Sequence, residues 1–298
     1  MSLDDLDLIL DKEAIISTFP AESLASEPLR VESDYLVHAK THIPLGDTSS
    51  YVDNLFKWVS GANKGTFIGA VLGDYGEGKT SFLVHVWAQS KERRVLAVPP
   101  FQWRSFEAII DAVASWIGYL LRETRPDLSK RVEGLREEYR ENTVEALARE
   151  TVAKEGGDYD TTLAALKRAL DAGGVKLSAM SAGRVLDFFA EASEISVEAG
   201  YLGLLVLLDE PEKAADALGT QAIHLFLFDL ADELLRRQGN YGVFVSLPRN
   251  FHASAVARFP ALTARLAGRK CFPSLTDLYG AGFATDLWGR FASAFELG

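Results

Sequence analysis

Eight residues in the first third of the chain have the spacing of a loop that binds polyphosphate. Residues 73–80 read GDYGEGKT and match G-x-x-x-x-G-K-[ST] in full, between an apolar run at 66–72 and an apolar helical pattern that continues from Ser81. Glycines let the backbone turn its N–H groups toward phosphate, and the helix adds its positive N-terminal end. A chance match is disfavoured by these flanking elements. The residues expected to contact a nucleotide are Gly73, Asp74, Tyr75, Gly76, Glu77, Gly78, Lys79, Thr80 and Ser81.

A second pattern, LLVLLDE at 204–210, is an apolar strand that ends in two acidic residues. Lys79 is expected to neutralise the β- and γ-phosphates, and the Thr80 hydroxyl to bind magnesium. Asp209 is expected to hold the metal directly or through water, and Glu210 to polarise an attacking water molecule. The alternative is a buried strand that merely ends in solvated carboxylates. The pairing with the glycine loop argues against it.

Polar and cationic residues after the next apolar run form a third group of candidates. Ser246, Arg249 and Asn250 are placed to reach a γ-phosphate, and the alternative is an ordinary exit from a strand into a loop. Arg258 and Arg265 follow, and either could stabilise phosphate charge in a neighbouring subunit. Surface arginines on a helix are the competing interpretation for this pair.

Short apolar runs alternate with helical patterns, which is typical of a parallel sheet covered on both faces. One interval is unusually long, because about a hundred residues separate the second strand from the third. A crossover needs far fewer, so 123–198 are predicted to form a helical insertion. The second strand is expected to stop at Pro99 and Pro100. Strands are expected at 66–72, 94–98, 201–208, 242–247 and, last, 270–273.

Composition excludes several classes of protein. The 298 residues are 48% hydrophobic and 24% charged, which is too apolar for a disordered chain, and no uncharged stretch is long enough to span a bilayer. The acidic N-terminus does not resemble an export signal, and the single cysteine, Cys271, excludes an internal disulfide. We therefore expect a cytoplasmic protein with no membrane partner.

Charge is distributed unevenly along the chain. The net charge of −11 argues against general coating of nucleic acid, yet 236–298 hold eight basic and three acidic residues. This basic third permits a local anion or partner site. Residues 1–40 hold nine acidic and three basic residues, and Pro20 and Pro28 are expected to break any long helix. A loosely packed acidic arm is predicted there.

With these motifs in place, 43–275 resemble the AAA+ ATPases, in particular the origin-recognition-like and STAND-like branch. The resemblance rests on GDYGEGKT, LLVLLDE, GVFVSLPRN at 242–250 and RFPALTARL at 258–266. GDYGEGKTSFL and LLDEPEKAAD are also similar to ATP-binding proteins of bacterial phage-defence loci of the BREX type. The resemblance implies ATP with Mg²⁺, an α/β P-loop fold whose five parallel strands lie in the order 5-1-4-3-2, and homo-oligomers in which Arg258 or Arg265 serves as an arginine finger.

The resemblance also predicts how the chain is divided. An ATPase core at 41–275 would follow the arm at 1–40 and precede a C-terminal helical segment at 276–298. Residues 275–295 are too few for a full helical lid, and Arg290 is the only arginine among them. We therefore expect a reduced or missing lid, or a longer polypeptide.

The leading functional hypothesis is an ATP-hydrolysing switch or motor that works with itself, with a DNA-processing partner or with a phage-defence partner. Two alternatives stay open. A nucleotide-binding scaffold with little turnover would be expected to lack one of the two acidic residues after the apolar strand, whereas Asp209 and Glu210 are both present. A small-molecule kinase would need an acceptor pocket and an Arg-rich lid, and the single lysine at 201–235, Lys213, weighs against it. DNA binding is left open by the sequence.

Overall fold

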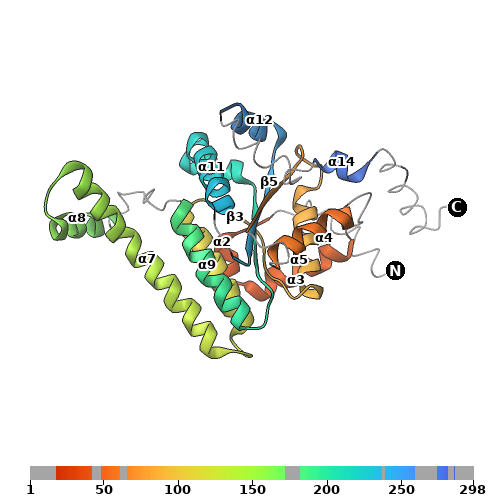
Figure 1. The fold of residues 1–298 in the computed structure, drawn as a ribbon, viewed down its shortest axis with the longest axis horizontal. Helices are drawn as coiled ribbons and strands as arrows, with labels where there is room; N and C mark the ends of the chain where they lie inside the picture. The colour runs from red at the N-terminus through yellow and green to blue at the C-terminus, as the bar shows by residue number, and fades with distance from the viewer. Residues whose placement is uncertain are drawn as a thin grey trace.

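A five-stranded, all-parallel sheet lies at the centre of the computed structural model, with its strands in the order β1-β3-β4-β5-β2 (Figure 1). The structure describes residues 18–41, 48–60, 66–171, 182–236, 239–258, 274–280 and 285. The strands are β1 (Phe19–Pro20), β2 (Phe67–Leu72), β3 (Leu96–Gln102), β4 (Leu204–Asp209) and β5 (Tyr241–Leu247).

Helices cover both faces of this sheet, which keeps it out of water as a parallel sheet requires. One face packs against α3 (Pro28–Thr41), α4 (Thr48–Val59) and α5 (Lys79–Glu92). The other packs against α6 (Phe106–Leu121), α9 (Ala182–Glu198) and α11 (Thr220–Arg236). Shorter helices complete the layers: α2 (Ala21–Ser26), α10 (Pro211–Leu218), α12 (Arg249–Arg258) and α14 (Leu275–Tyr279).

The α/β class predicted from the sequence is confirmed, and four predicted strands lie where the apolar runs placed them. Every residue of β4 and β5 is buried, as expected of central parallel strands. The prediction that Pro99 and Pro100 stop the second strand is wrong. β3 continues through both prolines, and its pairing with β4 shifts register between Val98 and Phe101. Such an irregularity tolerates residues that cannot donate a ladder hydrogen bond.

The predicted five-strand order is not the order of the described sheet. The fifth strand is β1, which pairs with β3 at the edge opposite β2. The predicted strand at 270–273 lies outside the described residues, and the next residue, Ser274, forms an isolated parallel bridge with Leu72 of β2. The four shared strands keep the neighbours that the prediction gave them. The predicted segment at 276–298 also lies mostly outside the described residues.

Residues 18–41 are not a loosely packed arm. Leu24, Val31 and Tyr35 are at most 1% exposed and belong to the main hydrophobic core. The helices α2 and α3 are separated just before Pro28, as predicted, and Pro28 is the first residue of α3, where the missing N–H has no intrahelical partner to lose. Of the acidic side chains in the described part of this segment, Glu22 and Glu27 are exposed, and Glu32 and Asp34 are partly buried.

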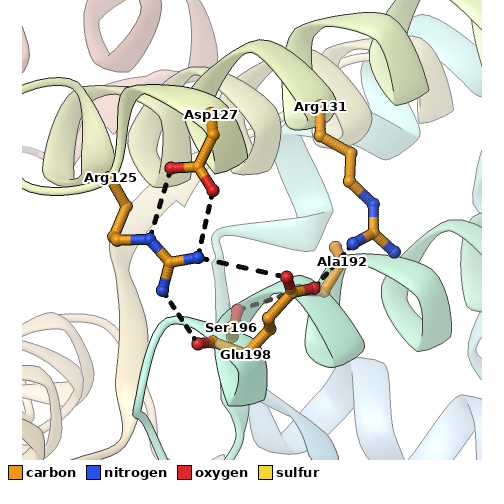
Figure 2. A network of polar contacts seen from close by, with 6 residues as sticks. All are labelled: Arg125, Asp127, Arg131, Ala192, Ser196 and Glu198. Atoms are coloured by element: carbon orange, nitrogen blue, oxygen red, sulfur yellow. Dashed lines mark hydrogen bonds and ion pairs between the residues drawn. The ribbon is translucent and has the colours of Figure 1, made fainter.

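The described part of the insertion predicted at 123–198, which leaves out 172–181, is helical. It consists of α7 (Pro126–Glu155), α8 (Tyr159–Asp171) and α9, which returns the chain to the sheet. In Figure 1, α7 runs along the outside of the helical layer and carries α8 away from the sheet. Ion pairs join the start of α7 to the end of α9 (Figure 2). No helix among the described residues is long and apolar enough to cross a membrane.

Candidate functional site

The glycine loop at 73–78 joins β2 to α5 at the carboxyl edge of the sheet. Gly76 and Gly78 have φ angles of 83° and 89°, a left-handed conformation that favours glycine. A Cβ at Gly73 would lie 2.9 Å from Oε2 of Glu77 and 3.2 Å from Cγ of Lys79, so these side chains would have to shift to admit a larger residue. The helix begins at Lys79 without a side-chain cap, which leaves the N–H groups of its first turn available to a ligand. Such a loop can wrap an anion.

Lys79 and Thr80 begin α5 and face different partners. Lys79 Nζ donates to the carbonyl oxygen of Asp74 at 3.0 Å, so its ammonium lies across the loop. Thr80 Oγ1 donates to Oδ2 of Asp209 at 2.7 Å. The two sequence patterns are 129 positions apart at this contact. The fold therefore brings together the loop and the acidic strand end that the sequence singled out separately.

Asp209 is fully buried and accepts several hydrogen bonds from neutral groups. Its Oδ2 accepts from Thr80 and from the Thr18 hydroxyl, and its Oδ1 accepts from the Ser246 hydroxyl and from the Glu210 N–H, the last at 3.1 Å. These donors orient the carboxylate without balancing its charge. Burial of a carboxylate is costly without such bonds or a cation.

The oxygen atoms around Asp209 are suitable ligands for a magnesium ion. Mg²⁺ prefers oxygen ligands and in phosphate sites uses one or two carboxylates together with substrate oxygens and water. Carboxylate and hydroxyl oxygens of Asp209 and Thr80 supply that chemistry. Within the described ranges, no cluster of three or more His, Cys, Asp or Glu side chains is arranged for a metal. A bound ion would therefore depend on oxygens that the ligand and water contribute.

Glu210 has an unusual backbone. Its φ of 51° is left-handed, which is uncommon for a residue other than glycine, and such strain costs on the order of 1–3 kcal/mol and collects at functional sites. Its N–H donates to Asp209 Oδ1 and to the Ser246 hydroxyl oxygen, the latter at 3.2 Å. Its carboxylate forms an ion pair with Lys213 Nζ at 2.8 Å. Neighbouring Glu212 is partly buried, and that burial raises its pKa.

Arg249, predicted to reach a γ-phosphate, is held by acidic residues of the glycine loop. Its Nη1 donates to Asp74 Oδ2 at 2.9 Å and to Glu77 Oε1 at 2.7 Å, and its Nη2 donates to Ser274 Oγ at 3.1 Å. The hydrogen bond to Glu77 is the main cause that raises the pKa of the guanidinium above its ordinary value. Arg249 thus joins the loop to the chain after β5. Its contact with a phosphate stays a prediction.

The other predicted residues lie in different places. Ser246 is fully buried at the end of β5 and hydrogen-bonds Asp209, so it supports the acidic strand end. Asn250 is exposed in the first turn of α12, where its Oδ1 accepts from the Phe251 N–H at 2.8 Å. Arg258 is the last residue of α12, and Arg265 lies outside the described residues. The proposed arginine finger stays a prediction.

Two residues near the loop were missed by the sequence reasoning because both lie in the segment expected to be an arm. Thr18 contacts Asp209, and His38 Nε2 lies 2.9 Å from Ser81 Oγ in the first turn of α5. Burial lowers the pKa of His38 to about 4, so the ring is neutral at pH 7. The helical spacing of Leu24, Val31 and Tyr35 was the available sign that this segment packs.

Comparison of the chain with protein-family models, with curated proteins and with solved structures gives no significant match. The geometry of the site therefore carries the functional argument.

Proposed function

We propose that this protein binds ATP with Mg²⁺ at the carboxyl edge of its sheet and hydrolyses it. The observation that carries the proposal is the 2.7 Å hydrogen bond between Thr80, at the start of α5, and Asp209, at the end of β4. Phosphate loops need a hydroxyl and a carboxylate at a common metal position. Here the glycine loop and the acidic strand end, each predicted from the sequence to serve that chemistry, are in contact.

The loop and α5 would bind the phosphates. Gly76 and Gly78 permit the turn that aims backbone N–H groups at an anion, and the helix start adds partial positive charge. Lys79 is the cation of the loop, and its ammonium need only leave the Asp74 carbonyl to meet a β- or γ-phosphate oxygen. Thr80 and Asp209 would hold the Mg²⁺, which when bound neutralises charge on the phosphate oxygens.

Glu210 would act on water. Its carboxylate accepts a proton from water as the water oxygen forms a bond to the γ-phosphorus, and the bond from that phosphorus to the β–γ bridging oxygen breaks. ADP leaves with the bridging oxygen, and the proton passes from Glu210 to phosphate or solvent. Ser246 positions this group, since its hydroxyl contacts both Asp209 and the Glu210 N–H.

One observation favours a second candidate, a nucleotide switch with little turnover. The Glu210 carboxylate is paired with Lys213 at 2.8 Å, and this ion pair would have to open before the carboxylate could turn toward a water molecule. Turnover of the purified protein separates the two candidates. A rate well below about 1 s⁻¹, the low end of ordinary enzymes, would favour the switch.

Assembly and partners follow from the AAA+ resemblance and are part of the proposal. The ATPase should be measured with and without DNA, and the molecular mass on a sizing column with and without ATP. Stimulation by DNA would support a DNA-processing partner, and ATP-dependent growth in mass would support a homo-oligomer.

Lys79→Ala tests the binding step. The substitution removes the loop's ammonium, so ATP affinity should fall by at least about tenfold, which is the loss of one charge-assisted interaction of about 1.4 kcal/mol or more. Binding of a labelled ATP at saturating Mg²⁺ measures it.

Lys91→Ala is the matched control. Lys91 lies in the last turn of the same helix and pairs with Glu32 on the surface, so its loss removes one positive charge far from the loop. Equal affinity of the Lys79→Ala variant and the parent would refute the phosphate-loop assignment.

A further inference from the structure

The edge strand β1 lies close to Asp209, which is proposed to bind the metal. β1 pairs in parallel with β3, where Pro20 lies opposite Gln102, and Gln102 in turn lies opposite Asp209 on β4. The two residues of β1 therefore lie level with the last two residues of β4, Leu208 and Asp209. Thr18, the residue before β1, is 4% exposed there.

A buried tyrosine anchors this short strand. The hydroxyl of Tyr35 in α3 accepts from the Phe19 N–H at 3.1 Å and donates to the Pro100 carbonyl at 2.8 Å. Burial raises the pKa of Tyr35, so the hydroxyl keeps its proton and both bonds persist at neutral pH. Edge packing of the Phe19 and Tyr35 rings, 5.4 Å apart, adds to the anchor. Thr18 thus directly precedes a strand that is anchored on both sides.

Three side-chain oxygens, from Thr18, Thr80 and Asp209, lie close together. The Thr18 and Thr80 hydroxyls both donate to Oδ2 of Asp209, and the two hydroxyl oxygens lie 3.5 Å apart. Thr80 Oγ1 and Asp209 Oδ2 lie 2.7 Å apart. Neighbouring ligands of an octahedral Mg²⁺, each about 2.1 Å from the ion, are separated by about 3 Å. The separations of Thr80 Oγ1 from Asp209 Oδ2 and from Thr18 Oγ1, 2.7 and 3.5 Å, lie on either side of this value, so the three oxygens are grouped closely enough to share one ion.

We propose that Thr18 supplies a third protein oxygen to the metal site, beside Thr80 and Asp209. The inference rests on the proposed ATP site and extends it, because it makes residues before the phosphate loop part of metal binding. In the resting structure the Thr18 hydroxyl orients Asp209. With the ion bound, a lone pair of its oxygen would face the ion while the hydroxyl keeps its proton and its hydrogen bond to Asp209.

Thr18→Val tests this, because valine keeps the shape and loses the oxygen. The Mg²⁺ concentration for half-maximal binding of labelled ATP should rise by about tenfold, the lower end of the effect of losing a group that supports a metal ligand. ATP binding in EDTA should not change. Mn²⁺ bound in the presence of ADP, followed by electron paramagnetic resonance, should show a correspondingly weaker affinity.

Two further variants separate metal binding from folding. Thr18→Ser keeps the hydroxyl and should restore the parent's Mg²⁺ dependence. Thr66→Val removes another buried hydroxyl, just before β2 at the opposite edge of the sheet, and should leave the Mg²⁺ dependence unchanged whatever it does to the melting temperature.

The outcomes distinguish this inference from the proposed function. If the parent binds ATP and Thr18→Val has the parent's Mg²⁺ dependence, the role of Thr18 is refuted and the ATP site stands. A lower Mg²⁺ requirement would also refute it, because Thr18 would then compete with the ion. If the parent binds neither ATP nor Mn²⁺, the proposed function and this inference fail together.

Discussion

Charged side chains lie at both the amino and the carboxyl edge of the sheet, and the two groups have different kinds of partner. At the amino edge, where α7 begins and α9 ends, Arg125 binds both carboxylate oxygens of Asp127, at 3.2 and 3.0 Å (Figure 2). Arg131 binds Glu198 at 2.6 Å, and Arg125 lies 4.0 Å from the same carboxylate. All four side chains are between 38% and 63% exposed.

At the carboxyl edge, Asp209 is buried and its hydrogen bonds come from neutral hydroxyl and amide groups. The amino edge balances two positive with two negative charges in water, as expected of a cluster that ties two helices together. At the carboxyl edge, the hydrogen-bond donors orient the Asp209 carboxylate but do not balance its negative charge. The difference indicates that residue type is a poor guide to function, whereas burial and the charge of the partners discriminate.

The largest expected effect at the carboxyl edge follows from Glu210→Gln. Glutamine keeps the shape and cannot accept the proton, so turnover should fall by at least about 100-fold while ATP affinity stays at the parent value. Steady-state phosphate release and labelled-ATP binding measure the two quantities. Glu194→Gln, on the exposed side of α9, should change neither. Unchanged turnover in Glu210→Gln would move the base to another residue.

Asp209→Asn should have the next largest effect. The amide keeps the size of the side chain but loses the charge that attracts the metal, so the Mg²⁺ concentration for half-maximal activity should rise by about tenfold. Asp127→Asn makes the same chemical change at the amino edge, where Arg125 is the partner, and should leave the Mg²⁺ requirement unchanged. Equal Mg²⁺ requirements in the two variants would abolish the distinction between the edges.

Much of the carboxyl edge could be predicted from the sequence because its signals are local. The turn at Gly76 and Gly78, the buried strand before Asp209 and the position of Ser246 each follow from short patterns. The partner of a long side chain, in contrast, depends on residues far away in the sequence. The sequence therefore placed Arg249 in the right region and left open that Asp74 and Glu77, more than 170 positions away, would bind it.

The N-terminal segment was misjudged for a related physical reason. Its composition is acidic, with nine acidic and three basic residues at 1–40, whereas Leu24, Val31 and Tyr35 decide that its described part packs. Pairing of Phe19 with Phe101 depends on a strand over 80 positions away, so a two-residue strand has no periodicity of its own to detect. Thr18 could be found only from the folded chain.

Arg249→Met should have a smaller effect than either acidic substitution. It leaves the Asp74 and Glu77 carboxylates uncompensated beside the bound polyphosphate, so ATP affinity should fall roughly fivefold, about 1 kcal/mol, the scale of two unit charges 4 Å apart in water. Labelled-ATP binding at low salt measures it. Adding Asp74→Asn and Glu77→Gln to this variant should restore affinity. Failure of that rescue would mean that Arg249 acts on the phosphate directly.

The smallest effect is expected from Glu198→Gln at the amino edge, where two contributions oppose each other. The substitution removes the ion pairs with Arg131 and Arg125, but it also removes a negative charge from the C-terminus of α9, where the helix dipole disfavours it. Arg125 still donates to the Glu198 backbone carbonyl at 3.2 Å, so the helix end keeps its partner. The melting temperature should therefore fall by only a few degrees, and the difference from the parent should shrink in about 1 M NaCl, where the Debye length is about 3 Å. ATP affinity and Mg²⁺ requirement should equal those of the parent. A loss of ATP binding in this variant, with the fold intact by circular dichroism, would show that the two edges are coupled and would overturn the separation drawn between them.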